Sequence, residues 1–269
     1  SPLMAIANAL AFLLYLSSSV ILIRDFVKRD HNANKLALPI GILTTLALLF
    51  HAADIYFTMK FAQGWDLSLM STLSIAAWLM AVIAMLAGMR SPVAHPGIVV
   101  YPLVALCLML KVEAPGGSQR DLSDPALEWH ILLSLTAYAL LALAAMQSII
   151  LAIQEKQLRN KHAGGLVRKL PPLQTMEKAL FQLLYTGFIL LTLGLITGFL
   201  FVDDFIAQHL AHKTVFSIIA WLVFAGLLWG RKQYGWRSQT AVKWTLSGFG
   251  FLLLAYVGSK FVLEVLIQS

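Results

Sequence analysis

The sequence predicts an all-α integral membrane protein: a bundle of eight transmembrane helices with the N- and C-termini on the outer (periplasmic) side. Two observations predict this fold class. The chain of 269 residues is 59% hydrophobic and only 12% charged, with a mean hydropathy of +0.78, whereas soluble domains carry about 25% charged residues. The basic residues also fall almost wholly into alternate gaps between eight apolar stretches, which is typical of multi-pass membrane proteins.

A helix needs about 20 apolar residues to cross the hydrocarbon layer, at 1.5 Å per residue. The eight predicted spans are 3–23, 36–59, 67–88, 97–112, 129–153, 179–201, 214–229 and 242–266. The stretch 97–112 is short and contains Pro102, so the charge pattern has to decide whether it crosses.

The distribution of Lys and Arg supports eight crossings. Four, one, six and four basic residues lie in or beside the gaps after the first, third, fifth and seventh spans, and five lie elsewhere. If 97–112 did not cross, the six-charge loop 154–178 would face outward, against the positive-inside rule. The net charge of +7 is therefore interpreted as an orientation signal and not as a nucleic-acid patch. We expect a multi-pass protein of a bacterial inner membrane.

The domain organisation predicted from the sequence is one membrane domain over 1–269. It comprises front spans one to five (1–153), a basic cytoplasmic loop (154–178) and spans six to eight (179–269). The loop contains paired glycines and paired prolines, which favour a hinge. Before the fifth span, Asp124-Pro125 predicts a helix cap followed by proline at the first helical position.

His51 is the first polar side chain predicted at membrane depth. It lies nine residues before Lys60, about 14 Å below the outer end of its helix. Asp54 shares its helix face and could accept the imidazole N–H and orient the ring for a metal. An ionised Asp near the helix centre costs roughly 2.5–3.5 kcal/mol, so it should be paired, protonated or functional. Simple hydrogen bonding of both residues to neighbouring helices explains the sequence equally well.

His130 is the second such side chain. With a helix starting near Pro125, it lies about 8 Å inside that start, and Ser134 and Tyr138 follow on the same face. His51 and His130 are thus predicted at similar depths, and two neutral imidazoles facing each other in an apolar cleft are what six-coordinate haem iron needs. An interfacial histidine beside Trp129 is the competing explanation, and the residues alone favour it.

Other features limit the function further. His209 and His212 precede the seventh span and could bind a metal or a haem edge, although solvation is the commoner explanation. Cys107 is the single cysteine, so no disulfide or cysteine-rich metal site forms within one chain. Neither a nucleophile elbow, a zinc-protease motif, a P-loop nor a dinucleotide fingerprint occurs in the sequence. We therefore expect a protein that is not an enzyme.

A series of motifs runs through the back half of the chain. They are Trp129-His130-Ile-Leu-Leu-Ser134-Leu-Thr-Ala-Tyr138, Leu170-Pro171-Pro172-Leu173, Thr186-Gly187-Phe188, the stretch 191–198, Lys213 with Ser217 and Trp221, Gly235-Trp236-Arg237, and Tyr256-Val-Gly258. The front half contributes Leu49-Phe50-His51 and Gly64 to Trp78. In order and spacing the chain resembles the cytochrome c assembly superfamily of haem-handling membrane proteins (CcsA/ResC type), closest to its YpjD/HemX-like subgroup.

The resemblance implies that His130 corresponds to an outer haem-ligating histidine and His51 to a membrane-embedded one. Three features depart from the family pattern. The loop 203–212 has no tryptophan, Trp229-Gly230 occupies the region of the second membrane histidine, and the C-terminal tail has no second outer histidine. Two of the usual four ligands therefore remain, which implies one haem and leaves presentation of haem to apocytochrome without support.

We expect an integral inner-membrane haem-binding protein of the cytochrome c assembly type that handles or transports haem, with heme b as the cofactor. The expected site consists of the axial ligands His51 and His130, Asp54 behind His51, Ser134 and Tyr138 lining the pocket, and Lys213 (or Lys60 or Arg120) at the propionates. The expected partners are the lipid bilayer, haem and proteins of cytochrome c biogenesis or haem synthesis, with no nucleic acid. The alternatives are a non-catalytic, HemX-like regulator or scaffold of haem biosynthesis acting through 154–178, and a small proton-coupled transporter using Asp54.

Overall fold

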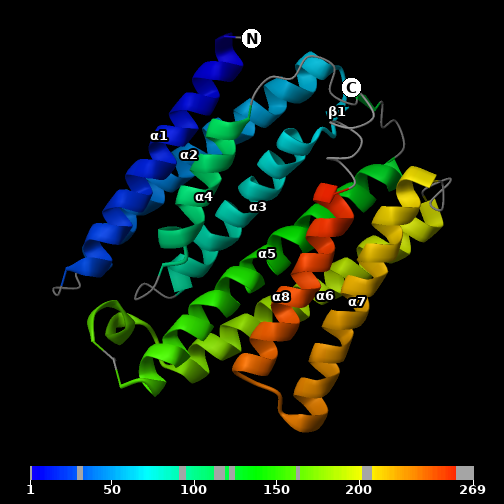
Figure 1. Cartoon of the computed structure of the whole chain (residues 1–269). Coiled ribbons are helices and arrows are strands. Elements are labelled where there is room, and N and C mark those ends of the chain that lie inside the picture. Colours follow the sequence, from blue (N-terminus) through cyan, green and yellow to red (C-terminus); the bar gives the residue numbers. More distant parts are fainter. Residues whose placement is uncertain are drawn as a thin grey trace. The chain divides into compact units, whose positions relative to one another are not determined.

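The structure, a computed structural model, describes residues 2–28, 33–90, 95–111, 119–120, 125–161, 164–201 and 208–258. In this part of the chain, eight α-helices follow one another with two very short strands and two helical turns (Figure 1). They are α1 (Pro2–Val27), α2 (Ala33–Ala62), β1 (Trp65–Asp66), α3 (Leu69–Arg90), α4 (Gly97–Leu110), β2 (Gln119–Arg120), α5 (Pro125–Arg159), η2 (Gly165–Lys169), α6 (Leu173–Phe201), α7 (Gln208–Tyr234), α8 (Gln239–Leu253) and η3 (Leu254–Gly258).

Seven of the described helices are long and apolar enough to cross a membrane, and α4 is a shorter apolar helix. The predicted all-α membrane fold is therefore confirmed. The fifth helix begins at Pro125, as the sequence predicted, but it continues to Arg159, six residues past the predicted end of the span. An i,i+4 ion pair between Glu155 and Arg159 (2.8 Å) supports this polar extension.

The contacts divide the chain into two compact units. Unit 1 comprises Ser1–Asp121 with Arg168–Pro171, and unit 2 comprises Leu122–Val167 with Pro172–Ser269. The sequence grouped the fifth span with the front spans, whereas α5 packs against α6 and α8. Unit 1 therefore contains α1–α4, and unit 2 contains α5–α8.

Unit 1 is a closed ring of four helices, because α1 and α3 each contact both α2 and α4. Small buried residues such as Ala11 and Ala81 let these helices approach closely. The largest side chains buried in this interior are Tyr15 and Tyr101, whose rings lie 5.9 Å apart. Each of these tyrosines brings a hydroxyl group into the membrane-spanning interior.

A two-residue antiparallel ladder joins two connecting segments of unit 1. Trp65 of β1 is opposite Arg120 of β2, and Asp66 is opposite Gln119. Because β1 follows α2 and β2 follows α4, the ends of these two helices lie at the same end of unit 1. We call this the ladder end.

A lysine caps the C-terminal end of α1. Lys169 Nζ donates to the carbonyl oxygens of Phe26 (2.9 Å) and Val27 (2.6 Å), which have no partner within the helix. A cation at a helix C-terminus is also favoured by the helix dipole. This contact explains why Arg168–Pro171 belongs to unit 1.

Unit 2 forms a second ring of four helices, in which α5 contacts α6 and α8, and α7 contacts α6 and α8. Glycines set the closest approach of α5 and α6. A Cβ atom added at Gly187 would lie 2.8 Å from Leu141 Cδ2, and one at Gly194 would lie 3.0 Å from Ser134 Oγ. The small-residue stretch of α6 therefore acts in helix packing.

Candidate functional site: two histidine centres

The first centre is His51, which lies on α2 with its side chain fully buried in unit 1. Its Nδ1 atom is 2.9 Å from the Tyr15 hydroxyl on α1, and its Nε2 atom is 2.9 Å from Ser74 Oγ on α3. The Tyr15 ring meets the imidazole edge-on, with ring centroids 5.7 Å apart. A neutral imidazole has one donor and one acceptor nitrogen, so one hydroxyl accepts and the other donates.

These contacts decide what His51 offers to a metal. Iron binds the lone pair of a ring nitrogen, while the other nitrogen is held by a hydrogen-bond partner. In the folded unit 1 both nitrogens of His51 already have a hydroxyl partner. Ligation of iron by His51 would therefore require the bond to Ser74 or the bond to Tyr15 to open. Its assignment as an axial ligand stays a prediction.

Asp54 lies one turn from His51, but its carboxylate contacts other residues. Its Oδ2 atom is 2.9 Å from Lys111 Nζ at the end of α4, and it accepts a longer hydrogen bond of 3.4 Å from Asn8 Nδ2 on α1. Lys111 also donates to Thr58 Oγ1 at 2.9 Å. The proposed orientation of His51 by Asp54 is thus replaced by a buried ion pair, with exposed side-chain fractions of 1% for Asp54 and 9% for Lys111.

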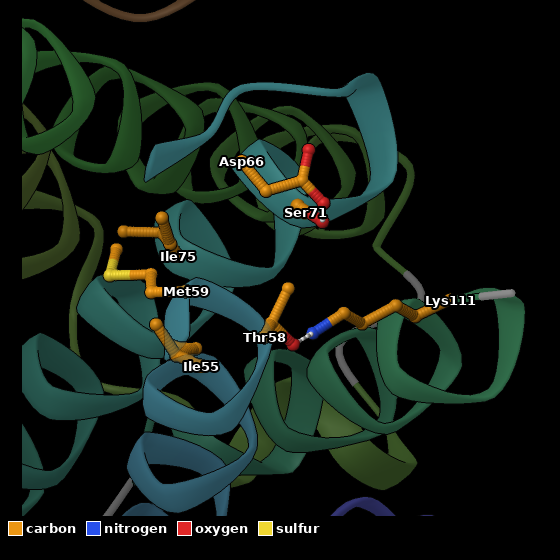
Figure 2. Close-up of a pocket in the computed structure, with 7 residues that line it drawn as sticks. All are labelled: Ile55, Thr58, Met59, Asp66, Ser71, Ile75 and Lys111. Carbon is orange, nitrogen blue, oxygen red and sulfur yellow. Dashed lines mark hydrogen bonds between the residues drawn. The ribbon is translucent and has the colours of Figure 1, made fainter. Parts of the chain in front are cut away.

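A small cavity adjoins this ion pair, as Figure 2 shows. Its volume is about 10 Å³, which is roughly the size that holds one water molecule. Lys111 points from α4 toward Thr58, and Asp66 and Ser71 lie on the other side of the cavity. The Asp66 carboxylate accepts a hydrogen bond of 2.8 Å from Ser71 Oγ. The cavity therefore has polar groups of α2, α3, α4 and β1 around it.

The second centre is His130, which lies half-buried near the start of α5 in unit 2. Its Nδ1 atom is 3.0 Å from Thr197 Oγ1 on α6. The Thr197 hydroxyl is also 2.9 Å from the Leu193 carbonyl and 3.0 Å from the Gly194 carbonyl. If the hydroxyl donates to one of these carbonyls, its oxygen accepts from His130 Nδ1–H. In this tautomer Nδ1 carries the proton, and Nε2 carries the lone pair and is the atom that would bind a metal.

The other residues predicted for this site also gather in unit 2. Ser134 packs over Gly194 one turn from His130, and the ring of Tyr138 lies 5.7 Å from that of Tyr256. Lys213 on α7 holds its ammonium 5.0 Å from the centre of the Tyr256 ring. The structure therefore brings one polar face of α5 next to a cation of α7.

The remaining candidates are placed as follows. His212 is exposed on α7, with its ring 4.6 Å from that of Phe216, whereas the side chain of His209 lies outside the described residues. Lys60 is exposed at the end of α2, and the side chain of Arg120 is likewise outside the described residues.

Several site residues were not found from the sequence. They are Tyr15, Ser74, Lys111 and Asn8 around the first centre, and Thr197 at the second. Each belongs to a different helix from the residue that it contacts, so local spacing carries no signal for the pairing. The one available signal was the heptad spacing of Thr44, His51 and Thr58, which places three polar groups on one face of α2.

Comparison with known proteins identifies the family of this chain. The family described as "Cytochrome C assembly protein" matches residues 3–267. The chain belongs to this family. It is 29% identical to the inner membrane protein YpjD of Escherichia coli over 98% of this chain and 100% of that protein. It is 21% identical to HemX of Brevibacillus brevis over 93% of each chain. No solved structure matches.

A third relative has a name that states a process. The cytochrome c biogenesis protein CcsA of Prochlorococcus marinus is 30% identical over 33% of this chain and 29% of that protein. Together with the membrane-spanning helices, these relationships confirm a multi-pass inner-membrane protein of the cytochrome c assembly family.

Proposed function

We propose that this protein binds haem in the membrane, in cytochrome c assembly or haem traffic, and that His130 is a ligand of the iron. The observation that carries the proposal is the His130–Thr197 contact of 3.0 Å. It holds the imidazole through Nδ1, and the backbone carbonyl of Gly194 is a further hydrogen-bond partner of the ring. A haem would supply an iron centre, and this chain would supply a histidine ligand to it.

The surrounding residues fit this role. Ser134 and Tyr138 line the same face of α5, and Lys213 is within electrostatic reach of His130, where it could meet a propionate. His51 is proposed as the second axial ligand, in exchange for its hydrogen bond to Ser74 or Tyr15. Heme b is the proposed haem, and the protein is proposed to hold and pass on haem without catalysing a reaction.

The test is the absorption spectrum of the purified protein, before and after addition of hemin. A haem-type Soret band should be present and should be lost in His130→Ala. His212→Ala is the matched control, because His212 is exposed on α7, and it should keep the band. Thr197→Val should weaken haem binding about 10- to 100-fold, the usual effect of losing the partner of a ligating histidine. A protein that stays colourless with added hemin would contradict the proposal.

His51→Ala separates two forms of the proposal. If His51 is an axial ligand, this variant should change the spectrum from bis-histidine to a form with one histidine. If the spectrum is unchanged while the melting temperature falls, His51 acts only in the hydrogen-bonded interior of unit 1.

A regulator or scaffold of haem synthesis is the second candidate, because the match to HemX covers 93% of both chains. Such a protein would act through its basic segment 154–178, which begins in the last turns of α5. Gln substitutions of Lys156, Arg159 and Lys161 remove charge while keeping Lys169, which caps α1. Loss of a co-purifying haem-synthesis enzyme in this variant, with the pigment unchanged, would favour the regulator. Retention of all partners would contradict it.

A further inference from the structure

The interior of unit 1 contains a column of polar side chains. On α2, Thr44, His51 and Asp54 are all buried, and Thr58 follows one turn later at the ladder end. From Thr44 to Thr58 the helix rises about 21 Å, which is about two-thirds of the roughly 30 Å hydrocarbon layer. The column therefore reaches from the ladder end past the middle of α2.

Neighbouring helices add further polar groups to this column. Ser74 and Tyr15 flank His51, while Asn8 and Lys111 flank Asp54. The groups come from all four helices of the ring. An interior that served packing alone would be lined by apolar side chains, because each buried polar group costs free energy unless it is hydrogen-bonded.

Three hydroxyl groups in the column lack such a bond. Ser18, Thr44 and Tyr101 are fully buried, and their oxygens have no hydrogen-bond partner among the described residues. The hydroxyls of Thr44 and Tyr101 lie near each other and interact, but their geometry falls short of a full hydrogen bond, so Ser18 is the clearest case of the three. Leaving a buried hydroxyl unpaired costs free energy, and proteins commonly satisfy such groups with internal water. A second observation agrees, since the cavity of about 10 Å³ between Lys111 and Ser71 has the size of a water site, with Ile55, Met59 and Ile75 beside its polar groups.

The two ends of the column differ. At the ladder end the cavity is lined by Asp66 and Lys111 and lies beside Asp54, so two acidic groups face one ammonium among the side chains that the structure describes there. Beyond Thr44, toward the other end of α2, the buried residue is Ile40, and the corresponding turn of α1 carries the buried Leu22. The polar lining thus stops at an apolar layer.

We propose that the interior of unit 1 is a half-channel for water and small cations, which opens at the ladder end and ends blind at Ile40 and Leu22. Water in it completes the hydrogen bonds of the orphan hydroxyls. The excess of one carboxylate favours cations over anions. The proposal does not depend on haem binding, since it concerns unit 1 and the space around its buried ion pair.

Accessibility of single cysteines to silver ion tests the proposal. In a Cys107→Ser background, Ser71→Cys, Ser74→Cys and Thr44→Cys place a thiol at the cavity, in the middle and near the blind end. Leu49→Cys is the control, because Leu49 is 61% exposed on α2, outside the interior of unit 1. A thiol reacts through its thiolate, which forms in water and hardly at all in hydrocarbon. We expect the three column thiols to react with Ag⁺ at least about tenfold faster than the thiol of the Leu49→Cys control, in the order Ser71→Cys, Ser74→Cys, Thr44→Cys.

Two further experiments test the blind end and the entrance of the half-channel. Ile40→Cys and Leu22→Cys should stay as unreactive as the Leu49→Cys control when Ag⁺ is added from the ladder side. Adding Ser71→Trp should slow the labelling of Ser74→Cys and Thr44→Cys. Ser18→Cys replaces any variant that does not give a monodisperse protein. Column thiols that react no faster than the control would overturn the proposal, and labelling of Ile40→Cys from both sides would overturn the blind end.

Discussion

His51 and His130 differ in what their ring nitrogens have left to bind. His51 has a hydroxyl at each nitrogen, whereas His130 has the Thr197 hydroxyl at Nδ1 and the backbone carbonyl of Gly194 as its described partners. In an apolar interior an unpaired polar group is costly, so the neighbouring side chains decide what a histidine can do. The same residue type therefore serves the hydrogen-bonded interior of unit 1 and a candidate ligand site in unit 2.

The stability of buried Asp54 likewise depends on its neighbour Lys111, which gives a quantitative prediction. Asp54→Asn leaves the Lys111 ammonium buried without its counter-ion, which should lower the free energy of unfolding by about 3–5 kcal/mol. The double variant Asp54→Asn/Lys111→Met should lose less than the sum of the single variants. Thermal unfolding of the purified protein in detergent measures all three.

Glu155→Gln supplies the control for this cycle. It breaks an ion pair of similar length, 2.8 Å, whose partner Arg159 is 62% exposed, so the effect should be about 0–1 kcal/mol. Equal losses from the buried and the exposed pair would show that burial does not set the strength of the Asp54–Lys111 interaction.

His95, in the turn before α4, provides a pH-dependent prediction. Burial lowers the pKa of His95 to about 4, and its Nδ1 accepts a hydrogen bond of 2.9 Å from the Gly97 backbone N–H. The unfolded chain, with a pKa of about 6.5, binds more protons than the folded protein between these values. The stabilisation is therefore complete above about pH 6.5 and is lost as the pH falls toward 4.

The measurement is the melting temperature of the wild type and of His95→Gln between about pH 7.5 and pH 4.5. The wild type should lose more on acidification, because glutamine has no proton to gain in this range. Parallel curves for the two proteins would show that His95 does not contribute to the acid sensitivity.

At the residue scale, the sequence predicted that His51 and Asp54 lie at membrane depth, and both side chains are buried in the structure. It did not predict their partners. The i,i+3 spacing suggested a local contact between the two residues, but Lys111, 57 positions away, carries a full opposite charge and provides the stronger interaction. Spacing along one helix contains no information about the residues that other helices bring to it.

At the scale of elements, α5 and α6 pair through glycine. Gly194→Leu would place a large side chain against Ser134, where even a Cβ atom would lie 3.0 Å from Oγ. Separation of the helices should destabilise unit 2 by about 1–3 kcal/mol and open the His130–Thr197 contact. The expected result is a lower melting temperature together with weaker haem binding.

Gly250→Ala on α8 is the matched control, since nothing lies within 4 Å of a Cβ atom added there. Alanine in place of a helical glycine should be neutral or stabilising by up to about 1 kcal/mol. A similar loss of stability in both variants would argue that flexibility, and not close packing, accounts for the glycines.

The sequence located the apolar part of each helix well, but it did not locate helix ends that continue into polar sequence. Hydropathy located the apolar core of each span, and the proline rule located the start of α5 at Pro125. Hydropathy cannot detect the continuation of α5 from Gln154 to Arg159, because those residues are polar. Their helix depends on internal pairs such as Glu155–Arg159 and not on burial in lipid.

At the scale of the whole molecule, the same contact order occurs twice: four helices in sequence, with the fourth packed on the first. The sequence showed no clean repeat of this kind. Ring closure needs only small or apolar residues at the contacts, which many sequences satisfy, so the arrangement can recur without recognisable similarity. The column of polar side chains in unit 1 belongs to the first ring, so similar helix contacts do not imply similar interior residues.

The orientation of the chain in the membrane depends on α4, and it remains a prediction. With 14 residues, α4 is about 21 Å long, shorter than the roughly 30 Å hydrocarbon layer. However, β2 follows α4 and pairs with β1, which follows α2. Since α3 leads away from the ladder end, the chain must return to it through α4. The β1–β2 pair therefore favours a crossing at α4, in agreement with the charge pattern.

Fusions of alkaline phosphatase, which is active only outside the inner membrane, test this orientation. Fusions after Gly64 and Arg120 should be active, and fusions after His95 and Lys161 should be inactive. The pair at His95 and Arg120 isolates the crossing of α4, while Gly64 controls for the first two helices. An inactive fusion at Arg120 with an active one at Lys161 would place the six-charge segment outside, and neither the ladder nor the positive-inside rule would then describe this chain.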